Sequence, residues 1–150
     1  MSTKIPPPIA TLIFGLIILF SKSLFPIYSF SNNVSLIFLF FGLIILITAV
    51  RSFKKHQTTI NPLNPDQASS LVNSGIFGFT RNPMYLGMLF ILLSRSFKFN
   101  ILGGIITCFL FKIYITRFQI VPEEEAMEKI FGKDFVEYKN KVRRLSLIHI

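Results

Sequence analysis

Two clusters of polar and charged residues lie within an otherwise apolar chain. One is residues 80–87, which include Arg81 and Tyr85, and the other is the acidic run at residues 122–125. An arginine beside a helix N-terminus attracts a carboxylate, and glutamates attract ammonium groups and ribose hydroxyls. Gly87 would let a flat group approach the backbone. Brought together, these residues would suit a zwitterionic ligand.

Four apolar segments must position these clusters. Hydrophobic residues make up 51% of the 150 residues, and 18 residues are Phe, which is more than a soluble domain of this size would carry. The pattern predicts helices at residues 8–25, 34–50, 83–94 and 101–118, with a tight turn at residues 95–100. We therefore expect an all-α integral membrane bundle of about four transmembrane helices.

The helices at residues 83–94 and 101–118 should form an antiparallel hairpin. The first of them begins at Asn82-Pro83, where Asn is a favoured N-cap and Pro is a favoured first residue. A hairpin returns the chain to the membrane face from which it started. The acidic run should therefore lie beside residues 80–87.

The distribution of basic residues predicts the orientation. Of the 16 Lys and Arg residues, only Lys22, Arg95 and Lys98 fall in outer loops if both termini are cytoplasmic, and Lys112 falls within a helix. The remaining basic residues lie on the inner side, as the positive-inside rule requires. We expect a multi-pass protein of a bacterial inner membrane, with both polar clusters at its cytosolic face.

Two further segments are polar. Residues 56–82 are rich in turn formers, which predicts an ordered loop with one short helix near residues 66–72. After Pro122 the chain should form a cytosolic amphipathic helix against the membrane face. Its apolar residues recur at helical spacing: Met127, Ile130, Phe131, Phe135 and Tyr138. We interpret residues 1–150 as one domain, with two spans in residues 1–55.

Other functions and a purely structural explanation compete with a ligand site. The basic residues flank apolar runs, which fits anionic lipid rather than nucleic acid. His56 and His149 do not form a metal-ligand set, so we expect no metal site. Arg81 could simply pair with a glutamate, and the acidic run could be a charged first turn. Lys112 more often snorkels than acts in chemistry.

Four motifs in order resemble the isoprenylcysteine carboxyl methyltransferase and phospholipid methyltransferase superfamily. They are Thr-Arg-Asn-Pro-Met-Tyr-Leu-Gly at 80–87, Glu-Glu at 123–124, Phe-Gly-Lys-Asp-Phe-Val-Glu-Tyr at 131–138 and Val-Arg-Arg-Leu at 142–145. The resemblance covers about residues 56–145. It departs from the family pattern in three places, with Asn82 instead of His, Phe135 instead of Tyr and Leu145 instead of Trp.

The resemblance implies a pocket for S-adenosylmethionine at the cytosolic face, capped by the C-terminal tail, so that residues 56–150 form a cofactor-binding core. By position it implies these cofactor-binding residues: Leu71, Val72, Gly75, Ile76, Arg81, Asn82, Tyr85, Gly87 and Glu124. It implies catalytic roles for Arg81, Glu123 and Glu124, and substrate binding by Arg144.

The implied activity is methylation of a lipid-like or prenylated acceptor at a carboxylate. One alternative is N-methylation of a phospholipid amine, which Asn82 favours because the prenylcysteine enzymes have His at this position. Another is a non-enzymatic membrane scaffold with the same fold. A nicotinamide-dependent reductase ranks last, because the chain contains no Gly-rich dinucleotide fingerprint.

Overall fold

The computed structural model describes residues 5–24, 32–55 and 75–145. The short helix expected near residues 66–72 lies outside this part of the chain. The elements are α1 (Pro7–Ser21), the 3₁₀ turn η1 (Lys22–Leu24), α2 (Asn32–Lys55), the 3₁₀ turn η3 (Gly75–Gly78), α3 (Pro83–Phe99), α4 (Ile101–Ile115), the π turn η4 (Thr116–Ile120), α5 (Val121–Phe131) and α6 (Lys133–Lys141).

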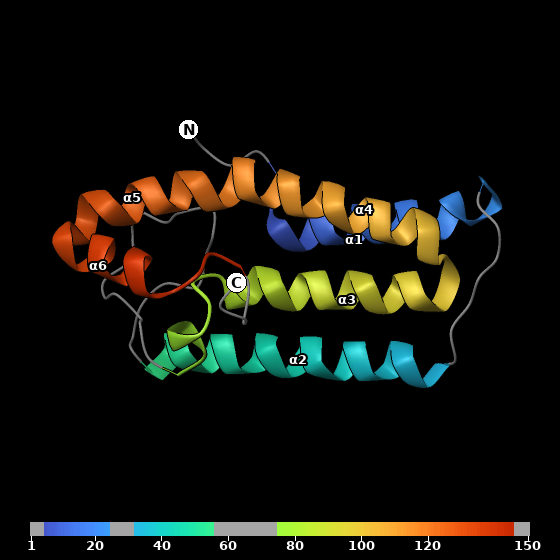
Figure 1. The fold of residues 1–150 in the computed structure, drawn as a ribbon, viewed down its shortest axis with the longest axis horizontal. Coiled ribbons are helices and arrows are strands. Elements are labelled where there is room, and N and C mark those ends of the chain that lie inside the picture. Colours follow the sequence, from blue (N-terminus) through green and yellow to red (C-terminus); the bar gives the residue numbers. More distant parts are fainter. Residues whose placement is uncertain (1–4, 25–31, 56–74, 146–150) are drawn as a thin grey trace.

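Helix α3 lies at the centre of the bundle. Helix α2 runs along one side of it, and α1 and α4 lie on the other side (Figure 1). Helices α3 and α4 form the expected hairpin, and α5 continues from α4 past the start of α3. The α5 and α6 helices therefore lie at the same end of the bundle as the N-terminus of α3.

Close packing joins α3 to α2 at both ends of their contact. A Cβ atom on Gly87 would lie 2.7 Å from Cγ of Leu46 and 3.0 Å from the carbonyl oxygen of Gly42, so only glycine fits there. Nearer the other end, the Ser35 hydroxyl donates to the Ser94 carbonyl at 2.9 Å, and the Ser94 hydroxyl donates to the Ser35 carbonyl at 2.8 Å. Small residues and hydroxyls commonly join helices in membranes.

The tight turn expected at residues 95–100 is wrong, because α3 continues to Phe99 and only Asn100 separates it from α4. The hydroxyl of Ser96 donates to the Leu92 carbonyl at 2.8 Å, so this polar residue is satisfied inside the helix. Asn100 then makes the turn alone. Its side chain accepts a hydrogen bond from the Gly103 amide at 3.1 Å and caps α4.

Helix α4, the π turn and α5 form one continuous helical run, Ile101–Phe131, rather than two separate helices. Pro122 does not break it. In the π turn the amide of Val121 bonds to the Thr116 carbonyl, five residues back, and this wider turn accommodates the proline that follows. A run of 31 residues is about 46 Å long, enough to cross a hydrocarbon core of about 30 Å and extend past it.

The chain is an all-α membrane bundle. Two helical runs, Asn32–Ser52 and Ile101–Phe131, are long and apolar enough to cross a membrane, and Pro7–Ser21 is a shorter apolar helix. Large apolar side chains cover the outward faces of α1, α2 and α4, including Leu12, Phe20, Phe40 and Phe109, each more than 60% exposed. So much exposed apolar surface suits lipid rather than water.

Candidate functional site

The hairpin brings the two polar clusters together, as the sequence predicts. Nη1 of Arg81, which precedes α3, lies 3.0 Å from Oε1 of Glu124 in the first turn of α5. In the first turn of α3, the hydroxyl of Tyr85 donates a hydrogen bond to the carboxylate of Glu123. The start of α3 and the start of α5 are therefore joined by two polar contacts.

A second arginine reaches Glu124 from the C-terminal segment. Nε of Arg144 donates to Oε1 at 3.2 Å, and its Nη2 donates to Oε2 at 2.9 Å. This is the bidentate geometry that only arginine can offer to a carboxylate. Glu124 thus lies between Arg81 and Arg144, and we refer to these three residues as the Arg–Glu–Arg cluster.

Backbone contacts hold the C-terminal segment against the start of α3. The amide of Arg81 donates to the Arg143 carbonyl at 2.8 Å, and Thr80 and Arg143 form an isolated parallel β-bridge. Asn82 occupies the expected N-cap position, but its side chain does not cap the helix. Its Nδ2 instead donates to the Arg144 carbonyl at 2.6 Å.

The Arg–Glu–Arg cluster is largely shielded from solvent at its centre. The side chains of Arg81 and Glu124 are each 11% exposed, whereas that of Arg144 is 42% exposed. Burial lowers the pKa of Arg81, Glu124 opposes this effect, and the charge of Arg144 adds to it. Arg81 remains a cation at physiological pH, because arginine is not deprotonated in proteins.

Arg81 has hydrogen-bonding capacity that the described residues do not use. Its Nε and Nη1 are buried, and neither makes a hydrogen bond of acceptable geometry there. The contact between Nη1 and Glu124 is an ion pair by distance but does not meet hydrogen-bond geometry. Buried donors without acceptors are uncommon and call for an explanation, such as an absent anionic ligand.

The apolar face of the tail packs inward. Phe135, Tyr138 and Val142 form a buried cluster, with Met127 and Phe131 packed against it. The helix of the tail breaks at Gly132, whose φ is 57°, into α5 and α6. Ile130 is 40% exposed and does not join the cluster.

Tyr138 fastens α6 to the turn before α3. Its hydroxyl donates to the Phe77 carbonyl at 2.7 Å. Burial raises the pKa of Tyr138, and the nearby charge of Arg81 partly opposes that rise. The tail is therefore held over the Arg–Glu–Arg cluster by a neutral tyrosine.

The structure places the other predicted cofactor residues differently. Leu71 and Val72 lie outside the described residues. Ile76 packs with Ala49 and Phe77, beside α2. Gly75 has a φ of 63°, a conformation that favours glycine.

Gly87 was expected to leave space for a flat ligand group, but α2 fills that space. The close approach that this glycine permits is between two helices. Ligand contacts at Gly75, Ile76 and Gly87 stay predictions.

Sequence reasoning missed Gln119, which is fully buried in the π turn. Its Nε2 donates to the carbonyl of Ile5 at 2.7 Å, ahead of α1. The sequence signal that could have indicated Gln119 is its uncharged amide between apolar residues, three positions before Pro122. Lys112, by contrast, lies on an exposed face of α4.

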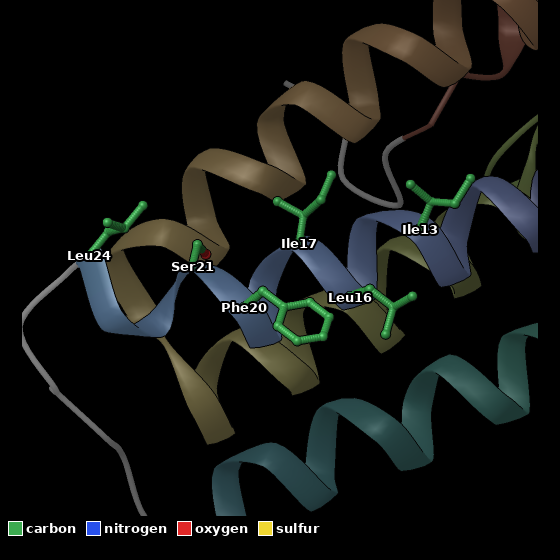
Figure 2. A pocket seen from close by; sticks show the side chains of 6 residues that line it. All are labelled: Ile13, Leu16, Ile17, Phe20, Ser21 and Leu24. Carbon is green, nitrogen blue, oxygen red and sulfur yellow. The ribbon is translucent and has the colours of Figure 1, made fainter.

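An apolar groove of about 430 Å³ lies on α1, and no residue of the Arg–Glu–Arg cluster lines it. Figure 2 shows the side chains that line it projecting from this one helix and η1: Ile13, Leu16, Ile17, Phe20, Ser21 and Leu24. The Ser21 hydroxyl donates to the Ile18 carbonyl at 3.3 Å, so it is satisfied locally. The groove offers a ligand only apolar contact.

A family match covers Arg81, Tyr85, Glu123 and Glu124 of this site but not Arg144. A family model described as phospholipid methyltransferase matches residues 30–134. An uncharacterized protein of Haemophilus influenzae is 38% identical over 61 residues, which are 41% of this chain and 97% of that protein. No solved structure matches the chain.

Proposed function

We propose that this chain, which belongs to the phospholipid methyltransferase family, transfers a methyl group from S-adenosylmethionine to the headgroup of a lipid at the cytosolic membrane face. The observation that carries the proposal is the buried Arg–Glu–Arg cluster, in which Nε and Nη1 of Arg81 make no well-aligned hydrogen bond with the described residues, although Nη1 pairs with Glu124 by charge. A bound carboxylate would supply those acceptors.

The residues present fit the amino-acid part of the cofactor. Arg81 would bind its carboxylate, and Glu124 would attract its ammonium group. The other cofactor contacts that we propose follow the sequence motifs: Leu71, Val72, Gly75, Ile76, Asn82, Tyr85 and Gly87. S-Adenosylmethionine, when bound, supplies a methyl group on a sulfonium, which is a good leaving group. The protein then has to align the acceptor and manage its proton.

We assign the acceptor side of the reaction to Glu123 and Arg144. The lone pair of the acceptor forms a bond with the methyl carbon while the carbon–sulfur bond breaks, and the electron pair of that bond stays on sulfur. If the acceptor is an amine, its proton passes to the Glu123 carboxylate, which Tyr85 holds in place. Arg144 is partly exposed and can also meet an anionic headgroup.

The proposed arrangement places residues 1–55 as two N-terminal spans and residues 56–150 as the cofactor-binding core. Both termini would be cytoplasmic, so the lipid tails would stay in the bilayer while the headgroup meets the Arg–Glu–Arg cluster. This arrangement is supported by the position of α5 and α6 at the end of the bundle where α3 begins (Figure 1).

A methyl-transfer assay tests the proposal. Purified protein in lipid vesicles would receive S-adenosylmethionine with a radiolabelled methyl group and either a prenylated carboxylate or an amine-bearing phospholipid. We expect label in one lipid product. If that product is the amine-bearing phospholipid, Glu123→Gln should lose at least tenfold in transfer, because its amide cannot take a proton. Label in neither lipid with wild-type protein would favour the scaffold alternative.

A further inference from the structure

Gln119 has an unpaired acceptor in a fully buried position. Its side-chain orientation is fixed by Ile5, whose carbonyl can only accept, so the bonded atom must be Nε2. The other atom, Oε1, is buried and makes no hydrogen bond with any described residue. Native proteins rarely leave such an oxygen unpaired, so it calls for an explanation.

The backbone at Gln119 is also unusual. Residues Thr116–Ile120 form a π turn inside a long helical run. Such turns are uncommon and occur often at functional sites, because they shift side chains out of the regular helical register. This turn places an amide, rather than an apolar side chain, in a fully buried position.

Gln119 and Glu123 lie four residues apart on this run, which puts them on about the same side of the helix. Glu123 is held by the Tyr85 hydroxyl from α3. One side of the helix therefore offers an unpaired amide oxygen and, one turn later, a carboxylate. Both groups accept hydrogen bonds, so together they suit a group that carries several N–H donors.

We propose that Gln119 is a specificity-determining residue of the acceptor site, and that its Oε1 accepts a hydrogen bond from an N–H group of an amine headgroup. The inference rests on the proposed function and deepens it by choosing the acceptor class. A carboxylate headgroup has no donor and would leave Oε1 unpaired.

In the proposed reaction Glu123 takes up the proton that the headgroup amine must lose. The ammonium group first gives one proton to the Glu123 carboxylate. Its nitrogen lone pair then forms a bond with the methyl carbon, the carbon–sulfur bond breaks, and the electron pair stays on sulfur. Glu123 returns its proton to water. Each transfer leaves the nitrogen with one N–H group fewer, so a fully methylated headgroup can no longer bond to Oε1.

Two variants separate this role from a structural one. Gln119→Leu removes the bond to Ile5 and the acceptor oxygen together. Gln119→Glu, as the carboxylate, removes the donor to Ile5 but keeps an acceptor oxygen at the same place. Both full-length proteins would be assayed with S-adenosylmethionine in phosphatidylcholine vesicles that contain a phospholipid with a primary, monomethylated or dimethylated amine, or a prenylated carboxylate.

We expect Gln119→Leu to raise KM for the amine lipids by about tenfold, the equivalent of one lost hydrogen bond, with unchanged cofactor binding by calorimetry. Gln119→Glu should stay within about threefold of wild type, because an acceptor remains. Equal losses in both variants would show that Gln119 only holds Ile5, and unchanged KM in Gln119→Leu would also overturn the inference. Wild-type transfer to the carboxylate alone would overturn the inference but keep the proposed function, whereas no transfer at all would overturn both.

Discussion

Arg81 and Glu124 form a nearly buried ion pair, 3.0 Å between Nη1 and Oε1, that joins the segment before α3 to the first turn of α5. Arg144 binds the same carboxylate from the C-terminal segment. The tail, the α3–α4 hairpin and the start of α5 therefore depend on one carboxylate. The stability of this end of the bundle and the proposed cofactor site should respond together to changes in it.

Loss of the Glu124 charge should destabilise the fold. Glu124→Leu removes the carboxylate and leaves Arg81 buried beside the like charge of Arg144. Breaking a buried ion pair in this way lowers the free energy of unfolding by roughly 3 kcal/mol. Thermal unfolding in detergent measures the effect. Glu128→Gln is the matched control, because the Glu128–Lys139 pair is 46% and 32% exposed and should be worth less than about 1 kcal/mol. Equal effects of the two variants would contradict the burial argument.

Gly87→Ala should weaken the packing of α3 on α2. The added methyl group would lie 2.7 Å from Cγ of Leu46, and overpacking of this kind costs about 1–3 kcal/mol. Gly15→Ala is the control, since its Cβ would meet only Cδ2 of Leu92, at an ordinary 3.8 Å. We expect a lower midpoint of thermal unfolding for the first variant only. A Gly87→Ala protein as stable as wild type would mean that the helices separate easily here.

Tyr138→Phe should loosen the tail. It removes the hydrogen bond to the Phe77 carbonyl, which is worth about 1 kcal/mol. Hydrogen exchange should become faster in α6 while α2 and α3 keep their protection. Tyr114→Phe serves as the comparison, because Tyr114 packs through its ring against Phe14 and Phe118. Unchanged exchange in α6 would show that the apolar cluster alone holds the tail.

Arg144→Lys should raise KM for the lipid acceptor more than it affects the fold. Lysine keeps the charge but cannot reproduce the two parallel bonds to Glu124, so the headgroup contact loses its fixed geometry. We expect KM to rise roughly tenfold, the equivalent of one charge-assisted hydrogen bond. Arg51→Ala, an exposed change at the end of α2, should leave KM as it is. A parallel rise in both variants would show that the effect does not depend on the contact between Arg144 and Glu124.

Much of the fold could be predicted because lipid exposure imposes a simple pattern. The apolar runs predicted the helices, and the predicted hairpin brought Arg81 close to Glu124, as the structure shows. The end of α3 was missed because a polar residue such as Ser96 looks like part of a turn, while its hydroxyl bonds within the helix. The continuity of α4 and α5 was missed because Pro122 normally interrupts a helix, and the π turn that accommodates it has no simple sequence signature.

The site was only partly predictable for a related reason. Motif positions placed Arg81, Tyr85, Glu123, Glu124 and Arg144 in one region, and the structure connects them by polar contacts. The side-chain roles of Asn82 and Gln119 depend on backbone carbonyls from distant segments, at Arg144 and Ile5. Such contacts arise from tertiary packing, which residue spacing alone does not encode.

Calorimetric titration of the detergent-purified protein with S-adenosylmethionine and its demethylated product tests the central claim most directly. We expect both compounds to bind wild-type protein, and Arg81→Ala and Glu124→Gln to reduce the affinity at least tenfold while Arg51→Ala does not. Absence of binding to a folded wild-type protein, or full affinity in both site variants, would contradict the assignment of the Arg–Glu–Arg cluster to the cofactor.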